Sequence, residues 1–110
     1  MTDTLRKTMK VTISGLTYDA VSGGGLFQTE RVDIARAFDE RPYGFGRQYV
    51  ADLSPEQAAV LGDHLQGYGE FFTGGGFDAD DYQTPREGRA CLRDAARIRD
   101  MLDRLEEVGR

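Results

Sequence analysis

The sequence predicts an α+β domain in which a three-stranded antiparallel meander is followed by two antiparallel helices packed on one face of the sheet. Three observations predict it: strand-like alternation in the first half, helical periodicity in the second, and a proline-containing capping sequence before each predicted helix. A chain of 110 residues with 39% hydrophobic residues can bury one core. We therefore expect one domain over residues 8–110, and a disordered N-terminal extension over the polar residues 1–7.

The first strand is predicted over residues 8–18, where Val11 and Ile13 alternate with Thr12 and Ser14. Residues 19–25 then form a glycine-rich loop.

Two structures fit residues 26–38. As a strand, this segment places Val32, Ile34 and Phe38 on one face; as a helix capped by Thr29, it aligns Val32, Ala35 and Phe38. We favour the strand, which gives the order βββαα. The alternative order is βαβαα, with residues 29–39 helical.

The third strand is predicted over residues 45–53, after a hairpin loop at residues 39–44. One face of this strand carries two aromatic residues and two other apolar residues: Phe45, Tyr49, Ala51 and Leu53.

The first long helix is predicted to begin at the capping box from Ser54 to Gln57 and to run to about Phe72. Its main apolar stripe consists of Ala58, Leu61, Leu65, Tyr68 and Phe72. A flanking stripe of Val60, His64 and Phe71 widens the apolar arc, which would suit a homodimer contact. Three glycines, Gly62, Gly67 and Gly69, predict bending or fraying in its second half.

The last helix is predicted from Thr84 to Val108, beginning with a second capping box, from Thr84 to Glu87. One apolar stripe runs along it at steps of three and four residues: Gly88, Cys91, Ala95, Ile98, Leu102 and Leu105.

Candidates for catalysis and metal binding are few. His64 is the only histidine and has no nucleophile at a suitable spacing, so we expect a satisfied histidine at the rim of the core. Cys91, on the buried stripe, is expected to be an inert packing residue. The acidic loop with Asp78, Asp80 and Asp81 fails the calcium-loop pattern. We therefore expect no catalytic residue, no metal and no cofactor; a small enzyme using a carboxylate such as Glu70 remains an unsupported alternative.

Charge and composition bear on the partner and on the compartment. The net charge of −5 disfavours nonspecific nucleic-acid binding, although it allows a local basic patch. There is no apolar run of membrane-spanning length and one cysteine, so we expect a cytoplasmic protein without membrane contact. Twelve arginines against two lysines are typical of GC-rich coding, as in a high-GC bacterium or one of its phages.

An arginine ridge on the last helix is the most unusual feature, with Arg86, Arg89, Arg93, Arg97 and Arg104 on one side. Like charges four residues apart cost about 0.2–0.5 kcal/mol per pair, and cations are disfavoured near a helix N-terminus. A sequence that breaks these local rules can record a function.

Three interpretations of the arginine ridge remain open. The first is an intrachain mesh in which Asp94 pairs with Arg97, Asp100 pairs with Arg104, and the acidic loop pairs with the start of the helix. The second is an acidic protein partner. The third is a phosphate-bearing ligand or nucleic acid bound by the Arg-rich start of the helix.

Surplus aromatic residues favour the second interpretation, because exposed rings beside arginines are typical interface anchors. We predict a non-enzymatic protein-binding module that inhibits or regulates a larger partner. Its predicted partner-binding residues are Arg86, Arg89, Arg93, Arg97, Arg104, Phe77, Tyr82, Tyr43 and Phe45.

Overall fold

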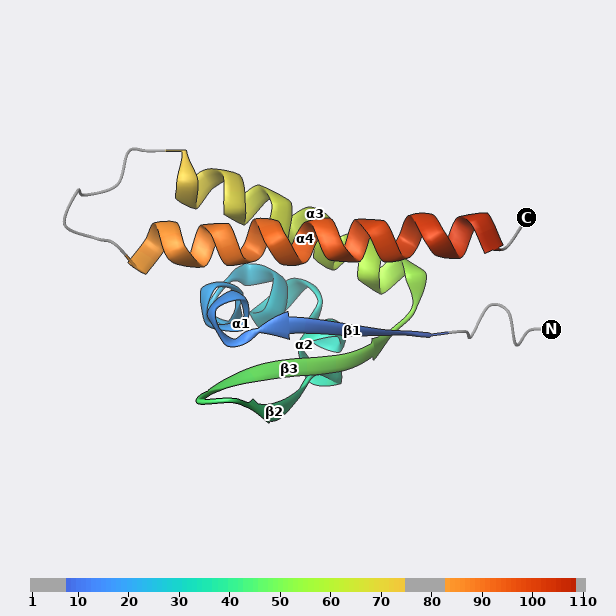
Figure 1. Ribbon diagram of the computed structural model, residues 1–110, viewed down its shortest axis with the longest axis horizontal. Helices are drawn as coiled ribbons and strands as arrows, with labels where there is room; N and C mark the ends of the chain where they lie inside the picture. Colours follow the sequence, from blue (N-terminus) through green and yellow to red (C-terminus); the bar gives the residue numbers. More distant parts are fainter. Residues whose placement is uncertain (1–7, 75–82, 109–110) are drawn as a thin grey trace.

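The computed structural model describes residues 8–74 and 83–108, which adopt an α+β fold (Figure 1). The predicted disordered extension at residues 1–7 lies outside the described residues. Three antiparallel strands form one sheet, and two long helices follow them, as predicted. The strands are β1 (Met9–Ser14), β2 (Asp39–Tyr43) and β3 (Gly46–Leu53).

The predicted meander is wrong, because the strand order in the sheet is β1-β3-β2. Three helical segments separate β1 from β2. Strand β3 occupies the central position next to β1, and β2 pairs with the other side of β3. The register pairs Val11 with Ala51 and Ile13 with Tyr49, and these four side chains form the buried face of the sheet.

The first predicted strand is too long. It ends at Ser14, whose hydroxyl accepts a hydrogen bond from the Thr17 backbone N–H at 3.2 Å and so caps helix α1 (Gly15–Ser22). This cap stabilises the first helical turn and outweighs the strand propensity of the β-branched Thr17. The predicted loop at residues 19–25 is therefore helical as far as Ser22.

The strand favoured for residues 26–38 is also wrong. A π-helix, η1 (Leu26–Glu30), and a short helix, α2 (Val32–Ala37), occupy this segment. The alternative with residues 29–39 helical comes closer, although it omits the strand that begins at Asp39. Burial explains the helices, because Leu26, Phe27 and Ile34 reach the core from helical positions.

Strand β2 occupies the segment predicted as a hairpin loop, and the turn itself lies at residues 44–45. All five residues of β2 are exposed, so no buried face produces an apolar alternation in its sequence. Gly44 has a φ of 59°, which suits glycine at this turn. Phe45 is fully exposed there, whereas Tyr49, Ala51 and Leu53, which were predicted to share one face with it, are buried.

The two long helices, α3 (Pro55–Thr73) and α4 (Gln83–Val108), run antiparallel and pack along each other (Figure 1). The predicted capping box of α3 is confirmed: Gln57 N donates to Ser54 Oγ at 3.1 Å, and Ser54 N donates to Gln57 Oε1 at 2.9 Å. Helix α4 begins one residue before the predicted Thr84, whose capping side chain lies outside the described residues.

Glycines allow α3 and α4 to approach closely. A Cβ added at Gly69 would lie 2.4 Å from Leu92 Cγ, and one at Gly88 would lie 2.8 Å from Phe72 Cβ. The predicted bending or fraying does not break α3, which is helical from Pro55 to Thr73. Close packing offsets the helix-propensity cost of Gly69, which is buried, while Gly67 faces open space.

The core lies between the sheet and the helices. Tyr18 of α1 stacks on Tyr49 of β3 with ring centroids 3.7 Å apart, and Phe27 and Phe38 pack edge-on against Tyr18. Helix α4 contacts both α1 and β1, so the beginning of α1 lies close to the middle of α4.

Candidate partner-binding surface

Helix α4 separates its apolar and cationic residues onto different faces. The inward face carries Cys91, Ala95 and Ile98, each at most 1% exposed, which confirms this part of the predicted stripe. All five arginines of the ridge are exposed to solvent. The sequence periodicity thus predicted correctly which side of the helix the arginines occupy.

Two of the predicted ion pairs are present along the arginine ridge. Arg97 Nη1 lies 3.5 Å from Asp94 Oδ1, and Arg104 Nη2 lies 3.1 Å from Asp100 Oδ2.

The other three arginines, Arg86, Arg89 and Arg93, form no ion pair with any residue in the described segments 8–74 and 83–108. Their predicted acidic neighbours, Asp78, Asp80 and Asp81, lie outside the described residues. Among described residues, two arginines of the ridge therefore take part in intrachain ion pairs, and three do not.

Asp94 holds α4 against the end of β1. This carboxylate is 1% exposed, and its Oδ2 accepts hydrogen bonds from Ser14 N at 3.1 Å and Thr17 Oγ1 at 2.6 Å. The bonds fix the position of the neighbouring Arg93 and Arg97 relative to the sheet. The sequence indicated Asp94 only as a partner of Arg97, because contacts to residues 80 and 77 positions away leave no periodic signal.

A polar hollow of about 330 Å³ lies beside this contact, between α4 and the face of the sheet opposite the core. Residues from all three strands and from α4 line it: Thr12, Ser14, Tyr43, Arg47, Gln48, Arg93, Asp94 and Arg97. Arg47 was not among the predicted site residues. It joins this hollow because β3 is the central strand, which the predicted meander did not provide.

The structure describes two of the four aromatic residues that were predicted as interface anchors. Tyr43 is 67% exposed and lines the polar hollow with Arg93, and Phe45 lies fully exposed at the adjoining turn. The structure therefore brings one predicted aromatic together with the arginine ridge. Phe77 and Tyr82 lie outside the described residues. Arg104 lines a different, apolar hollow near the end of α4, with Met9, Met101 and Leu105.

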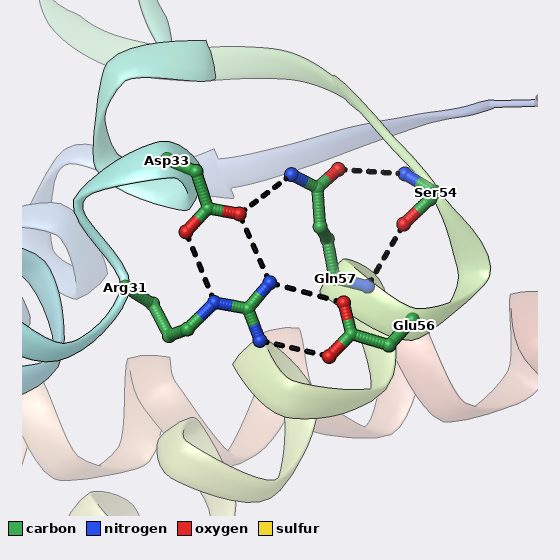
Figure 2. Close-up of polar contacts among 5 residues, drawn as sticks. All are labelled: Arg31, Asp33, Ser54, Glu56 and Gln57. Carbon is green, nitrogen blue, oxygen red and sulfur yellow. Dashed lines mark hydrogen bonds and ion pairs between the residues drawn. The ribbon is translucent and has the colours of Figure 1, made fainter.

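Arg31, unlike the arginines of the ridge, has its guanidinium donors engaged by neighbouring carboxylates (Figure 2). Its guanidinium donates to both oxygens of Asp33, at 3.0 and 2.9 Å, and to both oxygens of Glu56, at 2.8 and 3.0 Å. Gln57 extends the network by donating to Asp33 at 2.9 Å. These bonds lower the pKa of Asp33 and of Glu56, and they join the start of α2 to the start of α3.

His64 lies at the rim of the core, as predicted, but its ring is not fully hydrogen-bonded by the part of the chain that the structure describes. Its Nε2 is buried without a hydrogen-bond partner among the described residues, and its ring packs against Tyr68 with centroids 4.6 Å apart. Burial lowers the pKa of His64, which favours the neutral ring at neutral pH. Glu70, the carboxylate of the enzyme alternative, is exposed and accepts a hydrogen bond from Gln66.

Cys91 is fully buried, and burial, together with the charges of Asp94 and Glu87, raises the pKa of its thiol to about 12. The thiol is therefore protonated at neutral pH and a poor nucleophile, in agreement with the predicted packing role.

Within segments 8–74 and 83–108, no three potential metal-ligating side chains of His, Cys, Asp or Glu gather in one place. No helix of these segments combines the length and the apolar character that crossing a bilayer requires.

Comparison of the chain with protein-family models, with curated proteins and with solved structures found no match.

Proposed function

We propose that this chain is a non-enzymatic protein-binding module that docks onto an acidic surface of a larger partner and inhibits or regulates it. The docking surface consists of the arginine ridge with Tyr43 and Phe45. One observation carries the proposal: Arg86, Arg89 and Arg93 are exposed on one face of α4 and have no ion-pair partner among the described residues.

The electrostatics of α4 support a partner of opposite charge. Arg89, Arg93 and Arg97 are spaced four residues apart, so their mutual repulsion costs about 0.2–0.5 kcal/mol for each neighbouring pair. Carboxylates of a partner would remove this repulsion, and opposite charges across an interface speed association.

The neighbouring aromatics support a protein partner. An interface buries aromatic and arginine side chains at its centre, and these residue types contribute most of the measured binding energy. Tyr43 lies beside Arg93 and Arg97 at the polar hollow, and Phe45 adjoins it at the turn of the β2–β3 hairpin.

Affinity capture from the native host, followed by mass spectrometry, tests the proposal. The ridge variant carries Arg86→Glu, Arg89→Glu and Arg93→Glu. A control variant with the same change in net charge carries Arg36→Glu, Arg41→Glu and Arg99→Glu, all at exposed positions away from the ridge. We expect wild type and control to retain one specific partner and the ridge variant to lose it.

Capture of the same partner by the ridge variant at wild-type yield would refute the assignment of the docking surface. A homodimer formed through the flanking stripe of α3 stays a separate prediction, which sedimentation velocity on the purified chain would test.

A further inference from the structure

The polar hollow brings together arginines from two distant parts of the chain. Arg47 comes from β3, while Arg93 and Arg97 come from consecutive turns of α4. Its volume of about 330 Å³ reaches the lower end of the range found for small-ligand sites, about 300–1,000 Å³. The fold thus holds three guanidinium groups around one space of ligand size.

Within segments 8–74 and 83–108, the hydrogen-bond donors of these three arginines are largely unused. None of them donates a hydrogen bond to a residue within the described ranges, in contrast to Arg31, which makes four. Arg47 lies 3.8 Å from Asp19 and 3.7 Å from Glu40, distances too long for good hydrogen bonds. Such exposed, loose pairs contribute little stability, so a better-placed anion can replace them.

The lining has a charge that suits a dianion. Among the lining residues, three guanidinium groups and the single carboxylate of Asp94 leave two positive charges, and the carboxylates of Asp19 and Glu40 lie outside the lining, loosely paired with Arg47. Oδ2 of Asp94 already accepts bonds from Ser14 and Thr17, so this carboxylate is partly neutralised. The Thr12 hydroxyl and the Gln48 amide supply neutral donors on the sheet side.

We infer that the polar hollow binds the dianionic phosphate group of a phosphate monoester. A phosphate monoester carries about 1.5 to 2 negative charges near neutral pH and three acceptor oxygens. Guanidinium groups that approach from two sides can each bond two of these oxygens, which a planar carboxylate with one charge cannot match. The inference rests on the proposed function, since the phosphate would be carried by a phosphorylated side chain of the docking partner. A free phosphate ester offers the same chemistry.

NMR titration of the whole chain with sodium phosphate at pH 7.5 tests the inference, with sodium chloride at matched ionic strength as the reference salt. We expect saturable shifts of the Nε–H signals of Arg47, Arg93 and Arg97. Shifts that rise linearly without saturating, or that chloride reproduces, overturn the inference because they would report ionic strength alone.

Single variants locate the binding. Arg47→Gln and Arg93→Gln should each weaken phosphate binding at least tenfold. Arg99→Gln is the matched control on α4, because Arg99 is exposed but is not part of the lining of the hollow, and it should leave binding unchanged. Equal weakening by all three variants overturns the assignment to the hollow. Thermal melts confirm that these exposed substitutions leave the chain folded.

Two further ligands distinguish the source of the phosphate. A phosphoserine peptide that binds at least tenfold more tightly than phenyl phosphate supports a side chain of a protein partner. Equal affinity for the peptide and phenyl phosphate would overturn the assignment to a protein partner and would favour a free phosphate ester. If phosphate fails to bind while the ridge variant still loses its partner, this inference fails and the proposed function stands. If phosphate binds while the ridge variant keeps its partner, the proposed function fails and the phosphate site stands.

Discussion

Asp94 is a buried side chain that controls the geometry of the neighbouring surface. Its carboxylate bonds Ser14 and Thr17, at the junction of β1 and α1, and thereby fixes the turn of α4 that presents Arg93 and Arg97. The polar hollow exists because this contact holds a helix against the outer edge of β1. Sequence periodicity identified the arginines, whereas the contact itself depends on a fold that brings together residues about 80 positions apart.

Removing this carboxylate should destabilise the fold. In Asp94→Ala, the Ser14 N–H and the Thr17 hydroxyl lose their buried acceptor, and we expect the free energy of unfolding to fall by about 1–3 kcal/mol. Urea denaturation at pH 7 measures this change. Asp94→Asn, which keeps an acceptor oxygen in place, is the matched control and should lose less. Equal stability of the alanine variant and wild type would contradict the assigned role.

The α3–α4 pair is the element that the sequence predicted best. Both helices are long enough for a repeated apolar stripe, and the proline and capping box of α3 fixed its start at Pro55. The short helical segments α1, η1 and α2 were missed because five to eight residues give at most about two turns, too few to separate helical from strand periodicity. Strand β2 was missed because all of its residues are exposed.

A pair of glycine substitutions in α3 tests how the two long helices pack. Gly69→Ala forces a Cβ into Leu92 and the Gly88 carbonyl, so we expect a loss of about 1–3 kcal/mol of unfolding free energy. Gly67→Ala faces open space and improves helix propensity, so we expect a gain of up to about 1 kcal/mol. Thermal or urea unfolding of both variants measures the difference. Changes of the same sign at the two positions would show that backbone propensity, rather than close packing, dominates.

At the scale of the whole molecule, the five arginines of the ridge lie along one helix of an acidic protein with a net charge of −5. The arginine ridge could be derived from the sequence, because its members follow the helical period. Tyr43 was predicted to share a surface with the ridge, but the addition of Arg47 could not be predicted, since it requires the strand order β1-β3-β2 and the tertiary contact made by Asp94.

Acid should destabilise the whole fold through the Arg31 network. The pKa values of Asp33 and Glu56 are lower in the folded chain than their ordinary values of 3.8 and 4.5. The unfolded chain therefore binds more protons near these pH values. The stability that the two carboxylates contribute is present above about pH 5 and is lost as the pH falls through their folded pKa values.

Urea midpoints measured from pH 7 to pH 2 check this expectation. Wild type should lose stability steeply below about pH 4.5. Arg31→Gln should start from a lower midpoint and show a shallower decline, because Asp33 and Glu56 then lose the largest cause of their lowered pKa values. Parallel curves for the two proteins would mean that the acid sensitivity arises elsewhere.

Strand β2 at the border of the sheet has a consequence for self-assembly. A border strand offers unpaired backbone groups to which strands of other copies can add, and such addition is a common start of aggregation. Here Pro42 lacks the N–H that a continuous ladder needs, and Asp39, Glu40 and Arg41 place charges along the same strand. This border of the sheet is thus built to reject an incoming strand, so concentrated protein should resist growth into intermolecular β-structure at this position.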